Sequence, residues 1–257
     1  MFWATSPASY HTGSPARERV LPTGAMHLAI RLGGGPLRLF DNLGDAEGQS
    51  VGHAVAGGAR SGPYIRDVSE PVLSVGVLFR HGVGGMLVGV PAGDLAGRHT
   101  PLDDLWGASA RELRDRLAEA GSPERALDRF EMWLAGRLPR VRGLHPAVAH
   151  ALERFVVTAD VREVVRQTGY SHRRFVAVFR EAIGLTPKVY CRVIRLQRAL
   201  RVMAQGRAAS LTDASLAAGY CDQAHLTREF RDLAGVTPAE YRRAAPRQLH
   251  HVPIHGA

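Results

Sequence analysis

Cysteine is scarce, and its scarcity excludes two kinds of protein. The chain of 257 residues has 2 cysteines, Cys191 and Cys221. Two thiols cannot build the disulfide framework of a small secreted domain, and they fit a reducing cytoplasm as ordinary small residues. The N-terminal half has no cysteine at all. This absence argues against chemistry in which a thiol accepts an alkyl group.

Several patterns of membrane, secreted and catalytic proteins are missing as well. No apolar run approaches the roughly 18–20 residues needed to cross a bilayer. Residues 1–19 lack the basic start and apolar core of a secretion signal. There is no Gly-x-Ser-x-Gly sequence and no phosphate-binding loop, and the three glycines at 33–35 lack the strand–helix context of a dinucleotide site. We therefore expect a cytoplasmic protein that is not an enzyme and uses no cofactor.

Histidine is present but is not spaced as metal ligands usually are. Four histidines are scattered through the first hundred residues without paired ligand spacing beside an acid, so no metal site is predicted there. These four are His27, His53, His81 and His99. Three more lie close to the C-terminus, where we expect them to be solvated. They are His250, His251 and His255.

Acidic residues are too few to balance the arginines, and the imbalance is local. The formal net charge is +9. Residues 151–245 hold 16 Lys and Arg against 9 Asp and Glu, a net charge of +7. Concentrated positive charge raises the affinity for phosphate chains through counterion release, although a solvated basic surface has the same composition.

The pattern of apolar runs, glycine breaks and helical spacings along the chain predicts an α+β protein with two domains. Residues 1–16 are expected to be a flexible tail, and 17–138 an N-terminal sensor or dimerisation domain. Short apolar runs broken by glycine predict a small barrel-like or sandwich-like sheet there, with strands at 26–32, 37–40, 72–79 and 86–90. Helical spacings follow over 92–138. Residues 139–145 are the expected linker, 146–245 an all-α domain that opens with a helix to about residue 157, and 246–257 a second flexible tail.

A unit near residues 160–190 is repeated about fifty residues later. The first copy contains Gly169-Tyr170-Ser171, Phe175, Phe179, Gly184, Thr186-Pro187 and Tyr190. The second copy contains Gly219-Tyr220, Leu226, Phe230, Gly235, Thr237-Pro238 and Tyr241. The offset grows by one residue after the Gly-Tyr pair, which indicates that Cys221 is an extra residue in the second turn.

The turn residues of both copies predict two helix-turn-helix units. Asp160 with Glu163, and Ser210 with Asp213, have the spacing of a capping box. A glycine then ends each first helix in the left-handed conformation, and a capping residue starts the next helix. The predicted caps and turns are Asp160, Gly169, Ser171, Pro187, Ser210, Gly219, Asp222 and Pro238.

One long helix over 188–205 is predicted between the two copies. About 18 residues at ~1.5 Å each give roughly 27 Å. With the helix widths added, the two reading helices would lie about one DNA turn apart, ~34 Å, and could enter successive major grooves of one duplex. Arg192, Arg195 and Arg198 lie off its apolar face, where they either contact phosphate or hold the two halves in register.

Residues 146–243 resemble the AraC/XylS family of bacterial transcription regulators. The stretches that carry the resemblance are 219–231, Gly-Tyr-Cys-Asp-Gln-Ala-His-Leu-Thr-Arg-Glu-Phe-Arg, and 235–241, Gly-Val-Thr-Pro-Ala-Glu-Tyr. Departures from the family pattern are Val165 and Ser215, where a small alanine is usual, and Glu229, where an apolar residue is common. The resemblance implies sequence-specific binding to promoter DNA and control of transcription, with RNA polymerase as an expected partner.

Outward positions on the two second helices are the candidates for reading DNA. Arg173 and Arg228 suit guanine or phosphate, Gln223 suits adenine, and Val176 with Ala177 suits a thymine methyl group. The full set is His172, Arg173, Arg174, Val176, Ala177, Arg180, Gln223, Ala224, His225, Thr227, Arg228 and Arg231. For each arginine a phosphate or solvent contact is the alternative, and His225 has packing or capping as its alternative.

Parts of the N-terminal half resemble an uncharacterised domain found in some regulators of this family. They are residues 21–28, 75–80, 87–91 and 101–107. An apolar interior there could bind a small effector, or the domain could serve only for packing or homodimerisation. Two alternatives remain for the whole chain: a non-specific architectural DNA-binding protein, and a DNA-repair enzyme with an AraC-like domain. A regulator would prefer its own promoter by a factor of roughly 10³ or more, whereas an architectural protein would not.

Overall fold

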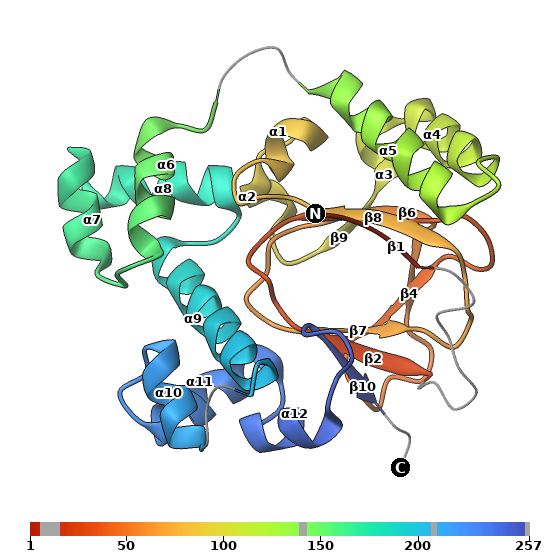
Figure 1. Cartoon of the computed structure of the whole chain (residues 1–257). Helices are drawn as coiled ribbons and strands as arrows, with labels where there is room; N and C mark the ends of the chain where they lie inside the picture. Colours follow the sequence, from red (N-terminus) through yellow and green to blue (C-terminus); the bar gives the residue numbers. More distant parts are fainter. Residues whose placement is uncertain (6–15, 139–142, 207–209, 255–257) are drawn as a thin grey trace.

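The computed structural model describes residues 1–5, 16–138, 143–206 and 210–254, and in this part of the chain the strands form two five-stranded antiparallel sheets (Figure 1). The first sheet has the order β1-β8-β3-β6-β9, with β1 Phe2–Thr5, β3 His27–Arg31, β6 Ala54–Gly57, β8 Ser74–Leu78 and β9 His99–Pro101. The second sheet has the order β10-β2-β7-β4-β5, with β2 Arg17–Val20, β4 Leu37–Phe40, β5 Gln49–Gly52, β7 Tyr64–Asp67 and β10 His251–Ile254.

The two sheets face each other without forming a closed barrel. Strand β3 alternates in burial: Leu28 and Ile30 are fully buried, while His27, Ala29 and Arg31 point to the other face. This two-residue period places an apolar face toward the covering helices and a more polar face toward the opposite sheet. The predicted α+β fold with a barrel-like or sandwich-like sheet is therefore confirmed as two facing sheets.

Helices cover the first sheet on its outer side. Short helices α1 Gly84–Val88 and α2 Ala92–Leu95 precede β9, and α3 Leu102–Trp106, α4 Ala108–Ala118 and α5 Pro123–Arg137 follow it. Figure 1 places α3–α5 above β8 and β6. Phe130 of α5 is fully buried, and its ring meets that of Phe2 edge-on at 5.8 Å. The trailing helices thus share the core of the first sheet.

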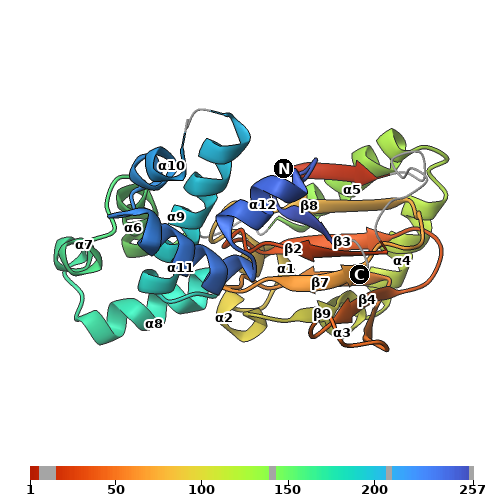
Figure 2. The same ribbon diagram turned by 90° about the horizontal axis from the view of Figure 1, so that it is seen from below.

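The remaining helices gather at one end of the strands, as Figure 2 shows. They are α6 Pro146–Phe155, α7 Val161–Thr168, α8 His172–Ile183, α9 Pro187–Ala204, α10 Leu211–Ala218, α11 Gln223–Ala234 and α12 Pro238–Ala244. No helix in the described ranges is both long and apolar enough to cross a membrane. The predicted domain boundaries remain predictions, and residues 139–142 of the expected linker lie outside the described residues.

Three expectations about local structure are wrong. Residues 84–88 form helix α1 rather than part of a strand, because a short apolar run fits either structure, and Gly89 (φ 84°) closes the helix by donating to Gly85. Strand β9 interrupts the expected helical stretch. The helix that begins at Pro146 ends at Phe155, earlier than the expected end near residue 157, and Val156 is exposed.

Both expected tails also contain strands, which is the largest departure from the sequence-based expectation. Residues 2–5 pair with β8, and residues 251–254 pair with β2. His250 and His251 are partly buried and hydrogen-bonded rather than solvated. The rest of both tails, 6–15 and 255–257 with His255, falls outside the described residues.

Candidate nucleic-acid interface and the cavity between the sheets

The first helix-turn-helix unit consists of α7 and α8. The Asp160 carboxylate accepts a hydrogen bond from the Glu163 amide at 3.0 Å, and Ser171 likewise caps α8. Gly169 ends α7 in the left-handed region at φ 74°. Only half of the predicted capping box is present, because the Glu163 carboxylate pairs with Arg166 instead of reaching back.

The second unit, α10 and α11, repeats these devices. Ser210 and Asp213 form a full capping box, and Gly219 (φ 86°) ends α10. The Asp222 carboxylate caps α11 by accepting from the His225 amide at 2.7 Å. Cys221 lies between Tyr220 and this cap, so it is the extra residue that the longer offset predicted.

Helix α9 connects the two units as a single 18-residue helix (Figure 1). Pro187 occupies its first turn, as Pro238 does in α12, where a missing backbone N–H costs nothing. Val193, Leu196 and Leu200 are fully buried along one face. The predicted long helix between the units is confirmed.

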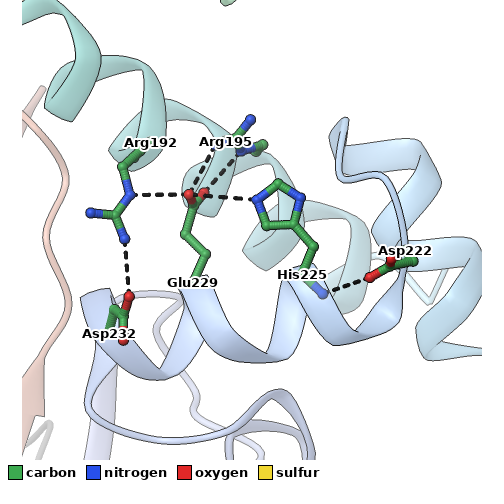
Figure 3. A network of polar contacts seen from close by, with 6 residues as sticks. All are labelled: Arg192, Arg195, Asp222, His225, Glu229 and Asp232. Atoms are coloured by element: carbon green, nitrogen blue, oxygen red, sulfur yellow. Dashed lines mark hydrogen bonds and ion pairs between the residues drawn. The ribbon is translucent and has the colours of Figure 1, made fainter.

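A buried carboxylate ties α9 to α11 (Figure 3). Glu229 is 6% exposed, and its two oxygens accept hydrogen bonds from Arg192 at 3.0 Å and from Arg195 at 2.9 Å. Arg192 also contacts Asp232 at 3.2 Å. Burial alone would raise the pKa of the Glu229 carboxyl, but the two arginines outweigh burial and lower it. The carboxylate is therefore charged at neutral pH and holds the second unit on the central helix.

Helix α6, which packs against both helices of the first unit, is held on α9 by hydrogen bonds to backbone carbonyls. Arg198 donates to the carbonyl oxygens of Phe155 and Val156 at the end of α6. Two roles were predicted for Arg192, Arg195 and Arg198: contacting phosphate, or holding the two halves in register. All three side chains make contacts of the second kind. The carboxylate partner of Arg192 and Arg195 was not predicted, and the sequence signal that could have indicated it is Glu229, a charged residue at a position where the family pattern is apolar.

The predicted reading positions of α8 are mostly on the surface. His172, Arg173, Arg174, Ala177 and Arg180 are exposed, and Val176 is half-buried. Arg174 also lines a second hollow, formed with α1 and the α1–α2 loop. Within the described residues Arg173 makes no ion pair, so its guanidinium is available to a ligand.

The predicted positions of α11 divide into two groups. Gln223, Ala224, Arg228 and Arg231 are exposed. Thr227 is half-buried and donates to the Gln223 carbonyl at 2.8 Å. His225 packs edge-on against Tyr220 at 5.1 Å and lies 3.9 Å from Glu229. His225 therefore has packing contacts of its own, and Arg228, which makes no ion pair in the described part of the chain, is the best-placed cation on this helix.

A cavity of about 460 Å³ lies between the two sheets. Residues from β1, β3, β7, β8 and β10 line it, and the lining cations include Arg31 of β3, Arg66 of β7 and Arg60 of the loop between β6 and β7. The sequence analysis did not predict this group of cations. They lie far apart in the sequence and come together only because antiparallel strands pair. Burial alone would raise the pKa of the Glu18 carboxyl beside it, but Arg66 and His251 hold it at about 2.

Three histidines near this cavity make stability depend on pH. Burial, and then the charges of neighbouring groups, lower the pKa values of His27 and His250 to about 4 and that of His99 to about 2, against a usual 6.5. As the pH falls below 6.5, these imidazoles therefore become protonated in the unfolded chain while they stay neutral in the folded chain. Stability is fully present above about pH 6.5 and is lost as the pH falls toward 4.

We expect the free energy of unfolding to fall by up to about 1.4 kcal/mol per pH unit for each such histidine below pH 6.5. Urea unfolding at pH 7, 6 and 5 measures how the free energy of unfolding changes with pH, in a range above the pH at which most carboxylates titrate. His27→Gln should flatten it, whereas His172→Gln, on the exposed start of α8, serves as the control. An unchanged slope in His27→Gln would contradict the assignment.

Comparisons with known proteins agree with this geometry. Residues 164–244 match the family described as "Helix-turn-helix domain". The chain is 26% identical over 151 residues to the HTH-type transcriptional regulator ArgR of Pseudomonas aeruginosa, which covers 55% of this chain and 45% of ArgR. It is 32% identical over 83 residues to YkgA of Escherichia coli, covering 32% of this chain and 34% of YkgA. The chain thus spans less than half the length of these two relatives.

Solved structures share the fold over nearly the whole chain. ToxT of Vibrio cholerae is 11% identical, with 95% of this chain and 97% of that chain covered and a TM-score of 0.50. ToxT of strain O395 bound to (E)-4-(8-methylnaphthalen-1-yl)but-3-enoic acid is 12% identical, with 95% and 98% covered and a TM-score of 0.51. Residues 164–244 are therefore similar to a helix-turn-helix domain, and the overall fold of the chain resembles that of ToxT.

Proposed function

We propose that this protein regulates transcription by binding promoter DNA in a sequence-specific manner. The α8 and α11 helices enter two successive major grooves of one duplex, and Arg173 and Arg228 contact bases or the adjoining phosphates. The observation that carries this proposal is the pair of exposed arginines, without an ion pair to any described residue, on two helix-turn-helix units that α9 joins. Binding, rather than catalysis, is the activity, and RNA polymerase is the partner through which it acts.

A small effector in the N-terminal half is the second part of the proposal. The cavity between the sheets is of a size that suits a small ligand, and its walls are formed by both sheets. A structure of ToxT, which shares the fold, holds a naphthalenyl butenoic acid. Homodimerisation through the N-terminal half is a further proposal of the same kind.

Selection from a random duplex library tests the first part. The full chain is expected to enrich sequences with two short conserved blocks about 10 base pairs apart, because successive major grooves on one side of a duplex recur at that interval. Binding that depends on salt but enriches no sequence would show an architectural DNA-binding protein instead.

Arg228→Ala is expected to weaken binding to the enriched site by about 1–3 kcal/mol, roughly tenfold to a hundredfold, if the guanidinium contacts a base. Binding to random DNA should fall much less. Fluorescence anisotropy at fixed salt measures both affinities, and Arg242→Ala, an exposed arginine on α12, is the matched control. Equal losses on both duplexes would make Arg228 a phosphate contact.

A further inference from the structure

The last strand of the chain belongs to the sheet of the other half of the molecule. After α12, the helix that follows the second helix-turn-helix unit, residues 248–254 turn back to the second sheet (Figures 1 and 2). There β10 pairs antiparallel with β2, with Val252 opposite Arg19. Pro253 is compatible with this position because β10 is an edge strand, where one row of backbone groups needs no partner. The DNA-binding half therefore supplies a strand to the N-terminal half.

This strand also forms part of the cavity wall. The cavity lies against residues 248–251, and against β1 at the edge of the facing sheet. Inside the wall, His251 contacts the Glu18 carboxylate at 2.6 Å. A molecule in the cavity would therefore touch the segment that follows the DNA-binding helices.

Two sets of hydrogen bonds connect the strand to those helices. The Gln197 side chain of α9 donates to the Pro22 carbonyl at 2.7 Å and contacts His250 at 2.6 Å, so it joins the central helix to the segments that flank β2 and β10. The Tyr241 hydroxyl of α12 donates to the Leu249 carbonyl at 2.9 Å. Gln197 is 8% exposed, so these bonds are shielded from water and are costly to leave unmade.

The charge of the cavity indicates the kind of ligand. Arg60 is half-buried, its guanidinium lies 4.6 Å from the Tyr64 ring, and it donates to the Gly97 carbonyl at 2.6 Å. It makes no ion pair with any residue that the structure describes. The other lining groups include Leu21, Leu37 and Leu78, which are apolar. A half-buried guanidinium in a cavity that also has apolar lining residues favours an anion with an apolar body.

We propose that the cavity binds a small amphipathic anion whose charged group pairs with Arg60, and that strand β10 transmits the filling of the cavity to α9 and α12. This inference rests on the effector part of the proposed function and adds the ligand class and the route. Gln197 and Tyr241 are the contacts that carry the route. A filled cavity holds β10 in place, and an empty one releases it.

The first arm of the test measures binding of two fluorescent probes to the full chain. One is 8-anilinonaphthalene-1-sulfonate, and the other is N-phenyl-1-naphthylamine, which has the same rings without the sulfonate. Arg60→Gln should weaken the sulfonate about tenfold, the loss expected for one charge-assisted hydrogen bond. Arg60→Lys should restore most of the affinity, and the neutral probe should change less than about twofold.

Arg38→Gln is the matched control for this arm, because Arg38 is exposed on β4 and does not line the cavity. An equal loss for both probes, or an equal loss in Arg38→Gln, overturns the assignment of the anion to Arg60. Circular dichroism of each variant separates lost binding from lost folding, and a folded Arg60→Lys protein keeps the comparison valid if Arg60→Gln unfolds.

The second arm follows amide hydrogen exchange with and without saturating sulfonate probe. Amides of residues 248–254 and of α12 should exchange at least about fivefold more slowly with the probe, because the strand opens less often. Strand β5, at the other edge of the same sheet, should not change. Probe binding without protection of 248–254, or with protection that stops before α12, overturns the route. The duplex selection described above is scored separately, so a failure of sequence-specific DNA binding remains distinguishable from a failure of this coupling.

Discussion

Replacing Glu229 by alanine is expected to lower the free energy of unfolding by about 3 kcal/mol. The substitution leaves Arg192 and Arg195 without the carboxylate that both contact, and breaking a buried ion pair from one side is costly because the remaining charge stays partly buried. Chemical denaturation followed by circular dichroism measures the loss.

Two further variants make this prediction specific. Asp232→Asn removes only the contact of a side chain that is 60% exposed, so its expected cost is below about 1 kcal/mol. Replacing Glu229 by leucine together with Arg192→Leu and Arg195→Met should recover most of the stability, because a well-packed apolar group can substitute for a buried ionic cluster. A loss below about 1 kcal/mol in Glu229→Ala would mean that solvent already screens the network.

Moving the two halves of the DNA site out of phase is expected to weaken binding about a hundredfold. Five base pairs inserted between the two conserved blocks turn the second block to the opposite face of the duplex, since a turn takes about 10 base pairs. The single helix α9, the Glu229 network and the Arg198 contacts together leave the second unit little freedom to follow. A hundredfold loss corresponds to about 2.8 kcal/mol.

Anisotropy titrations with matched duplexes measure this effect. The control duplex carries the same five base pairs outside the two blocks and should bind as tightly as the original site. Undiminished affinity for the interrupted site would show that the two units bind independently, as modules on a flexible connection do. Glu229→Ala, if it folds, should tolerate the insertion better than the unchanged chain.

Local signals in the sequence predicted the helical half well. The caps at Asp160, Ser171, Ser210 and Asp222 act through backbone groups within three residues, so a short window contains the whole interaction. The terminating Gly219 is equally local, because its left-handed backbone needs no distant partner. The long helix after Pro187 followed from the spacing of its apolar face.

Interactions between distant positions could not be predicted in this way. Strand β10 is a strand because β2 offers an open edge more than two hundred residues earlier, and nothing in its own composition indicates pairing. The pairing of β3 with β6 sets His27 opposite Gly57, three residues before the cavity cation Arg60. Burial, and then the charge of Arg60, lower the pKa of His27. Glu229 was visible as an unusual residue, but its arginine partners lie more than thirty positions away. The DNA contacts of the twelve candidate positions remain predictions.

The order in which the ribosome releases the chain gives the strand β10 a further consequence. The second sheet lacks its outermost strand until residue 254 has left the exit tunnel, so the N-terminal half is completed after the DNA-binding helices have been made. A fragment cut at residue 138 would present the bare edge of β2 to other chains, and such edges promote aggregation.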